Sequence, residues 1–434
     1  MTTRTYATEL SDRVLHAWSR AGFGVMQVGL ELAYDRPIDA ARLAAAFEGL
    51  RAHEPLVGCR FAEDGRGGRS WWEPVTRYRP LEVTDERDVY ERFLATPIRA
   101  GEEAQVKACL EQTGAGARLG IVMSHELADA AGLKDLAALV ARFYAQPEGP
   151  SPARARGPRS MAQVLERFTR RELLGAKLDG LVMLARTSWP RATVHTVQTG
   201  AGADGFRWVV EHVGRDTVDA LGAYGRTHGA TLNDLVTAAY LTAMGLISEA
   251  RPGARLRVMS TVDLRRYLPG GRAERLCNLS GFEVITLPRG AGWTFAATLA
   301  EVVRQMGARK RRLIGLAGVA SSPMLESVGQ GRLDFVFRAL FERWRRSGNL
   351  APSLTNMGPI DGGALGFDGR PPTSAWLIVP AHPPPHVGVG VSGYGGELTL
   401  TAAATPSFAP TMQALFRTMT GLLSDAVAKE GRTR

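Results

Sequence analysis

The sequence has 434 residues and a formal net charge of +10, with 45% hydrophobic and 22% charged residues. These proportions are typical of a globular protein with enough residues for two hydrophobic cores. No run approaches the ~18 apolar residues of a membrane-spanning helix, and the first residues lack the apolar core of a signal peptide, so we predict a cytoplasmic protein without a membrane span.

The three cysteines are isolated in the sequence, which predicts free thiols and neither a disulfide framework nor a metal site (Cys59, Cys109 and Cys277). Arginine clusters carry part of the positive charge, in 154–159, 167–171, 309–312 and 343–346. They lack interleaved aromatic residues and no nucleic-acid-binding motif accompanies them, so we expect no nucleic acid partner. A solvated face, or attraction to the phosphates of coenzyme A or to an acidic carrier protein, are the two interpretations that remain.

In the first half of the chain, strand and helix patterns alternate until a segment rich in Pro, Arg and Gly at 147–159 interrupts them. The expected elements are a helix at 39–52, strands at 56–62 and 118–124, a helix at 133–145, and a long helix at 161–185. Trp71 and Trp72 lie on a further strand pattern.

The second half repeats this alternation. We expect strands at 195–199 and 206–212, helices at 216–226 and 232–247, strands at 256–263 and 282–287, and a late helix at 410–427. The two runs predict an α/β fold with two subdomains, residues 1–187 and 188–434.

A strand pattern at 119–123 leads to Ser124 and His125, and Asp129 follows four residues later, before a helix pattern begins. A histidine at the end of a strand is a titratable base on a rigid element. The spacing H-x-x-x-D suits acyl transfer from a thioester, because a neutral imidazole can remove the acceptor's proton during attack. A histidine with a purely structural role at a strand end fits the same spacing.

The chain resembles the superfamily of condensation domains and coenzyme-A-dependent acyltransferases. That family's central motif is H-H-x-x-x-D-G, with which residues 124–130 align. Four further segments match in the same order: 37–61, 230–240, 259–280 and the segment Thr355-Asn-Met-Gly358, which is similar to the family's S-N-x-G. The likeness therefore spans nearly the whole chain.

The resemblance implies two chloramphenicol-acetyltransferase-like α/β subdomains that form a V-shaped pseudo-dimer with a tunnel at the seam. It implies that His125 is the general base and that Asp129 holds the loop by pairing with an arginine, for which we favour Arg265 over Arg266. Ser124, Gly132, Asn356 and Arg265 are the expected substrate-binding positions. No bound cofactor and no metal are expected; the co-substrate would be an acyl-CoA or a phosphopantetheinyl carrier-protein thioester.

Two positions depart from the family pattern. Ser124 replaces the first histidine, and Ala130 replaces the glycine after the aspartate, with a glycine only at Gly132. The chain also has no G-x-S-x-G motif, so a serine acyl-enzyme has no local support.

We therefore predict an acyltransferase that forms an ester or amide from a thioester and a small-molecule hydroxyl or amine, in natural-product or lipid biosynthesis. A free-standing condensation enzyme that forms peptide bonds, and a catalytically silent module that binds acyl or peptidyl carrier proteins, are the alternatives. The acyl chain, the acceptor and the donor carrier are not readable from the sequence.

Overall fold

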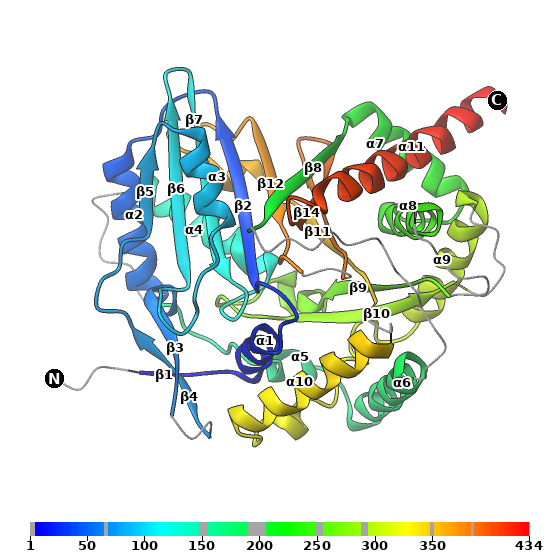
Figure 1. The fold of residues 1–434 in the computed structure, drawn as a ribbon, viewed down its shortest axis with the longest axis horizontal. Coiled ribbons are helices and arrows are strands. Elements are labelled where there is room, and N and C mark those ends of the chain that lie inside the picture. Colours follow the sequence, from blue (N-terminus) through cyan, green and yellow to red (C-terminus); the bar gives the residue numbers. More distant parts are fainter. Residues whose placement is uncertain are drawn as a thin grey trace.

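The structure is a computed structural model with two large mixed sheets, one small sheet and the helices that cover them (Figure 1). It describes residues 5–64, 68–146, 154–188, 205–247, 255–287, 294–347, 351–382 and 386–433. The α/β class predicted from the sequence is confirmed.

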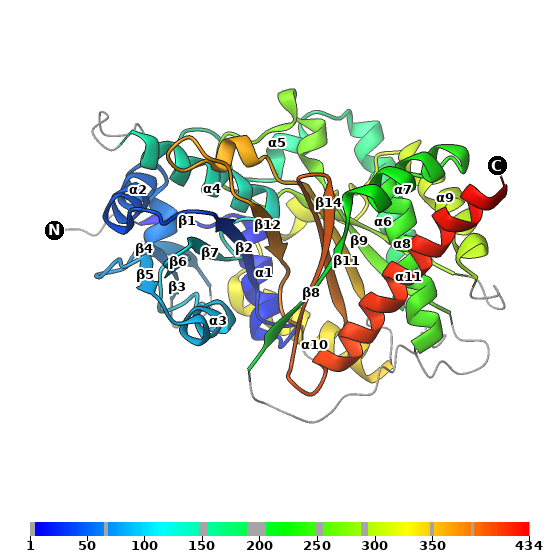
Figure 2. The same cartoon turned by 90° about the horizontal axis from the view of Figure 1, so that it is seen from above.

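The N-terminal sheet has five strands in the order β12-β2-β7-β6-β5. Its central pair, β2 and β7, is antiparallel, and Gln27 lies opposite Ser124 at the end where β7 finishes. Helices α2 and α4 pack on one face and α3 packs on the other (Figure 2). The elements are β2 Gln27–Tyr34, α2 Ala40–His53, β5 Leu81–Thr84, α3 Arg87–Ala95, β6 Val106–Thr113, β7 Gly116–Ser124, α4 Ala130–Ala145 and β12 Ser374–Ile378.

The strand β12 comes from the C-terminal part of the chain but pairs with β2 of the N-terminal sheet. Its Ala375 and Leu377 are buried in the same core as the residues of β2 and β7. The expected division into 1–187 and 188–434 is therefore crossed by this strand, which the sequence did not reveal because its partner lies more than 300 residues earlier.

The C-terminal sheet has six strands in the order β10-β9-β11-β13-β14-β8. Figure 2 shows α7, α8 and α11 together on one side of it. The elements are β8 Arg207–Val213, α7 Arg215–Thr227, α8 Leu232–Ile247, β9 Arg257–Asp263, β10 Ser280–Thr286, α9 Phe295–Lys310, β11 Ser353–Pro359, β13 Gly388–Tyr394, β14 Glu397–Ala404 and α11 Ala409–Thr433. A short 3₁₀ helix, Leu264–Tyr267, follows β9 and carries Arg265.

The remaining elements lie along the lower edge of the molecule in the view of Figure 1. A three-stranded sheet has the order β1-β4-β3, and helix α1 packs against α10. The elements are β1 Tyr6–Ala7, α1 Leu10–Arg20, β3 Cys59–Glu63, β4 Ser70–Pro74, α5 Ala162–Leu165, α6 Arg170–Ser188 and α10 Gln330–Ser347.

Most of the expected elements are present, with three differences in the first half. The strand expected at 56–62 begins only at Cys59, because Pro55–Gly58 form a 3₁₀ helix. The long helix expected at 161–185 is two helices, α5 and α6, and the helix expected from residue 133 begins at Ala130, because Asp129 caps it. The strand expected at 195–199 lies outside the described residues. Within the described ranges, no single helix is long and apolar enough to cross a membrane, and only the bent pair α7–α8 meets that test when its two helices are counted together.

Candidate active site

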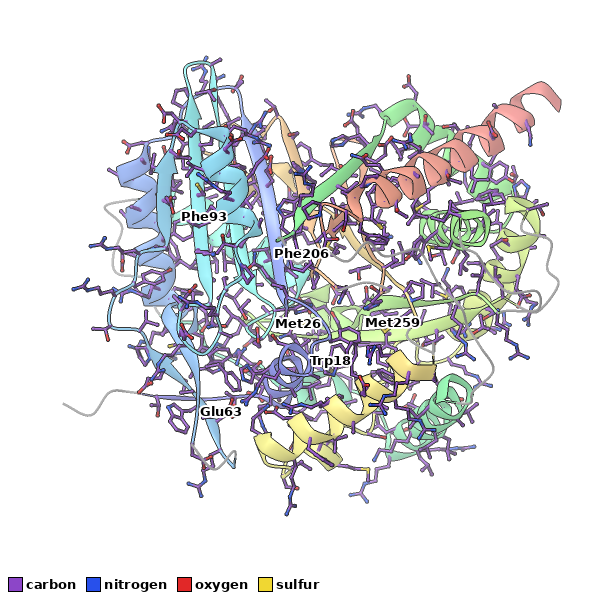
Figure 3. The ribbon with its side chains drawn as sticks, in the orientation of Figure 1. Trp18, Met26, Glu63, Phe93, Phe206 and Met259 are labelled. Carbon is purple, nitrogen blue, oxygen red and sulfur yellow. The ribbon has the colours of Figure 1, made fainter. Side chains whose placement is uncertain are left out.

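His125 is the first residue after strand β7, and it lies where the two large sheets approach each other. Its backbone N–H donates to the carbonyl of Met26 at 2.9 Å, which continues the pairing of β2 with β7. Figure 3 labels Met26 near the centre of the molecule, and the His125 ring lies 3.1 Å from Asn278, two residues before β10 of the C-terminal sheet. The strand ladder therefore holds the candidate base at the contact between the two halves.

Asn278 fixes the orientation of the His125 ring. Its Nδ2 donates to the backbone carbonyls of His125 at 2.9 Å and of Glu126 at 3.4 Å, so its Oδ1 must be the acceptor toward the ring. That oxygen lies 3.1 Å from His125 Nδ1. In the neutral imidazole the proton is then on Nδ1, and Nε2 keeps the lone pair that a general base needs.

Both carboxylate oxygens of Asp129 are engaged in hydrogen bonds that hold the loop of residues 125–129. Its Oδ1 accepts from the N–H of Gly132 at 3.0 Å and caps α4, while Oδ2 accepts from Arg265 Nη1 at 2.9 Å and from the N–H of Leu279 at 2.8 Å. Burial alone would raise the pKa of Asp129, but the charge and hydrogen bond of Arg265, with the two N–H donors, outweigh it and lower that pKa. The expected pairing with Arg265 is present.

A second buried arginine, Arg159, holds the same loop from the other side. Its Nη2 donates to the carbonyl of Leu127 at 2.8 Å and its Nε to the carbonyl of Leu276 at 2.8 Å, so it ties the 125–129 loop to the segment before Asn278. Its charge is balanced by Asp12 of α1, at 2.9 Å. Because Arg159 is only 4% exposed, it does not belong to the solvated or phosphate-binding face expected for the cluster 154–159.

Ser124 and Glu126, the neighbours of His125, are buried and bonded to each other. The Ser124 hydroxyl donates to the Glu126 carboxylate, and His16 Nδ1 lies 3.5 Å from that carboxylate. Burial opposes the charge of His16, but Glu126 and Glu63 outweigh it and raise the His16 pKa. The hydroxyl of Ser124 is thus engaged inside the protein, and its expected contact with substrate stays a prediction.

Ala130 and Gly132 form the first turn of α4. Outside glycine, the described residues contain one positive φ, at Asp368, so Ala130 adopts its helical conformation without the backbone freedom of a glycine. At Gly132 a Cβ atom would lie 2.7 Å from the Cβ of Ala128, which explains a glycine there by close packing. The replacement of the family glycine by Ala130 is therefore compatible with this loop.

Asn356 lies on β11, and its side chain bonds to its own strand end and to α8. Its Oδ1 accepts from the N–H of Gly358 at 3.0 Å and its Nδ2 donates to Asn233 at 3.1 Å. Lys134 of α4 donates to the carbonyls on either side of Gly358, which links this strand end to the helix that Asp129 caps. A role of Asn356 toward the acyl group stays a prediction.

A second histidine, His382, lies near His125. Burial, against a hydrogen bond to the Phe23 carbonyl and with a smaller contribution from the charge of the nearby His125, lowers the pKa of His382 to about 4. His382 Nδ1 lies 2.9 Å from the Phe23 carbonyl, and its ring contacts those of Phe23 and His386. His382 is thus a neutral imidazole near neutral pH, packed among aromatic rings close to the candidate base.

The cysteines and acidic residues offer no competing chemistry among the described residues. Burial raises the pKa of Cys59, Cys109 and Cys277 to about 12 each, so all three stay protonated thiols near neutral pH. No group of three or more metal-ligating side chains gathers within the ranges that the structure describes.

No protein-family model and no curated protein matches this sequence. Solved structures do match its fold. Polyketide synthase associated protein 5 from Mycobacterium tuberculosis has 16% identity and a TM-score of 0.63, over 97% of this chain and 100% of its own. The first condensation domain of the CDA synthetase has 16% identity and a TM-score of 0.68, over 98% and 97%. The epimerization domain from the third module of tyrocidine synthetase B has 13% identity and a TM-score of 0.66, over 99% and 98%.

These likenesses show that the chain has the condensation-domain fold over nearly its whole length, which confirms the resemblance inferred from the sequence. Because the identities are low and the matches include an epimerization domain, the fold alone does not select the reaction. The V shape and the tunnel at the seam stay predictions.

If Asn278 positions the base, Asn278→Leu should lower turnover by about 10²-fold, since a misdirected imidazole loses the geometry of proton transfer. Asn278→Asp would place a carboxylate beside the ring, and that charge favours the protonated imidazole. The acidic limb of the pH–rate profile should then move to higher pH. If Asn278 has only a structural role, its variants should be less stable. The acidic limb of the pH–rate profile of Asn278→Asp should then coincide with that of the wild type.

Proposed function

We propose that this protein transfers an acyl group from a thioester to a hydroxyl or amine, with His125 as the general base. The observation that carries the proposal is the orientation of His125. Asn278 holds the proton on Nδ1, so Nε2 is the basic nitrogen, and the strand ladder holds the ring at the contact between the halves. A neutral, aimed imidazole is what activation of an acceptor requires.

The proposed reaction needs no covalent enzyme intermediate. His125 Nε2 takes the proton of the acceptor hydroxyl or amine as that atom attacks the thioester carbonyl. The tetrahedral intermediate collapses when the C–S bond breaks, and the imidazolium returns the proton to the leaving thiolate. The products are an ester or amide and a free thiol. Asn278 stabilises the imidazolium between the two transfers, because its Oδ1 accepts the Nδ1 proton throughout.

The donor would be an acyl-CoA or a phosphopantetheinyl carrier-protein thioester, used as co-substrate. Among the structures with this fold, the first condensation domain of the calcium-dependent antibiotic synthetase has been solved in complex with a substrate analogue. The cluster 309–312 gives carrier docking little support, because Arg309, Lys310 and Arg312 pair with Glu283, Asp234 and Asp179 of the same chain. Free coenzyme A therefore remains as good a donor as a carrier protein.

The experiment is an assay with a set of acyl-CoA and acyl-pantetheine thioesters against a panel of alcohols and amines, read by mass spectrometry of the product. An ester or amide whose formation releases one thiol per product supports the proposal. An amide from aminoacyl donors alone would favour the peptide-forming alternative. Binding of acyl-carrier proteins without turnover of any donor would instead identify the silent module.

A further inference from the structure

Helix α6 turns its large apolar side chains outward. Leu174, Leu178 and Leu181 are 58%, 55% and 61% exposed, and their spacing places them on one helix face. The face toward the protein has small residues: Ala176 is 6% exposed, and a Cβ atom on Gly180 would collide with the carbonyl of Ala317. A helix that packs on its small residues and exposes its leucines presents a surface suited to a partner.

Helix α10 adds a second apolar group on the same lower edge of the molecule (Figure 1). Phe335 is 74% and Val336 54% exposed, and Met324, shortly before the helix, is 70% exposed. The opposite side of α10 is buried through Leu333 and Asp334. Both helices at this edge therefore present apolar side chains that the described part of the chain does not bury.

The exposed apolar residues are accompanied by positive charge. Arg338 and Arg343 are exposed on α10, and α6 begins with the exposed pair Arg170 and Arg171. Glu342 pairs with Arg345 and Arg346 and Asp179 pairs with Arg312, while the exposed Glu172 accepts hydrogen bonds from Thr169 at the start of α6. The surface is thus both apolar and basic.

We propose that α6 and α10 dock this protein on the surface of an anionic lipid bilayer, with the two helices lying on the membrane and not spanning it. Leucine and phenylalanine side chains would enter the region between headgroups and acyl chains, while the arginines meet anionic headgroups. A second copy of the chain would bring arginines against arginines. An anionic bilayer offers both kinds of partner along the whole length of two helices, acyl chains for the leucines and negative headgroups for the arginines.

The proposal goes beyond the proposed function and does not depend on it, because docking can be measured without turnover. We would sediment the full chain with vesicles of equimolar phosphatidylcholine and phosphatidylglycerol, and with vesicles of phosphatidylcholine alone. We expect binding to the anionic vesicles, weaker binding to the zwitterionic ones, and loss of the difference at high salt as the charges are screened.

Matched variants separate the two contributions. Leu174→Ser with Leu178→Ser and Leu181→Ser should lower the partition coefficient about tenfold or more, whereas Val83→Ser with Leu246→Ser, also exposed apolar residues, should leave it unchanged. Arg338→Glu with Arg343→Glu should lower binding to the anionic vesicles about tenfold or more. The control variant Arg92→Glu with Arg417→Glu, at exposed residues of α3 and α11, should bind the anionic vesicles as the wild type does.

Three results would overturn the proposal. One is a wild-type protein that does not sediment with anionic vesicles at low salt. Another is equal binding by the wild type and the triple serine variant, with the fold of the variant verified by circular dichroism. The third is a wild-type dimer that the triple variant converts to a monomer in light scattering, which would assign the face to a second copy. The single variant Leu178→Ser keeps the test decisive if the triple variant does not fold.

Discussion

His125→Ala should lower turnover by roughly 10²–10⁴-fold while leaving the thermal unfolding midpoint close to that of the wild type. The large effect on rate is expected because the variant lacks the only group that the structure aims, through Asn278, as a base at the contact between the halves. The small effect on stability follows because the loop is held by Asp129, Arg265 and Arg159, whose contacts do not involve the His125 ring.

The measurement is single-turnover kinetics with an acyl thioester that the wild type accepts, together with calorimetry. His228→Ala is the matched control, because that histidine is exposed and stacks on Tyr224; its rate should equal that of the wild type. A fully active His125→Ala would remove His125 from the mechanism and leave the neighbouring His382 as the base to examine. A variant that unfolds would show instead that the ring supports the fold.

The sequence predicted the parts of the site that depend on local order. The apolar run before His125 indicates a strand and the pattern after Asp129 indicates a helix, so β7, His125, Asp129 and α4 follow one another as expected, although the cap by Asp129 and the earlier start of α4 were not predicted. The pairing of Asp129 with Arg265 was also predicted, although only from the family resemblance.

The groups that orient this motif could not be predicted in the same way. Asn278 is 153 residues from His125 in the chain, and nothing in the segment Cys277-Asn-Leu-Ser280 indicates which of its polar side chains faces a ring. Arg159 lies in a cluster whose composition is typical of a surface, yet it is buried because carbonyls of two separate loops and Asp12 converge on it. Such convergence depends on the packing of distant segments, which no local pattern encodes.

The same reasoning applies to β12. Its five residues were not predicted as a strand, and their place at the edge of the N-terminal sheet follows only from pairing with β2. This strand and the loops held by Arg159 and Arg265 connect the two halves. We therefore expect the halves to depend on each other for stability at these connections, among them the buried Asp129–Arg265 pair.

Asp129→Ala should lower the free energy of unfolding by about 3–5 kcal/mol, because the Arg265 guanidinium, only 3% exposed, loses its buried carboxylate and keeps the more exposed Asp263 at 3.2 Å. Asp129→Asn should cost less, since an amide oxygen can still accept from the N–H of Leu279. Chemical denaturation gives these values. Glu103→Ala, which breaks the exposed pair with Arg99, should change the free energy by no more than about 0.5 kcal/mol and serves as the control.

Arg265→Met should be destabilising at pH 7 for the complementary reason, because it leaves the Asp129 carboxylate buried without a cation. In the wild type the pKa of Asp129 is lowered, so its stabilisation is present above the unfolded pKa of about 3.9 and is lost as the pH falls below it. Without Arg265, burial raises that pKa and the variant neutralises the aspartate at higher pH. The difference in unfolding free energy between the variant and the wild type should therefore be large at pH 7 and smaller near pH 4.

The double variant Asp129→Asn with Arg265→Met should lose less unfolding free energy than the sum of the two single losses, since both changes remove the same interaction. If the two losses of unfolding free energy are strictly additive, the pair does not hold the loop. The same conclusion follows if the loss in Arg265→Met does not change with pH.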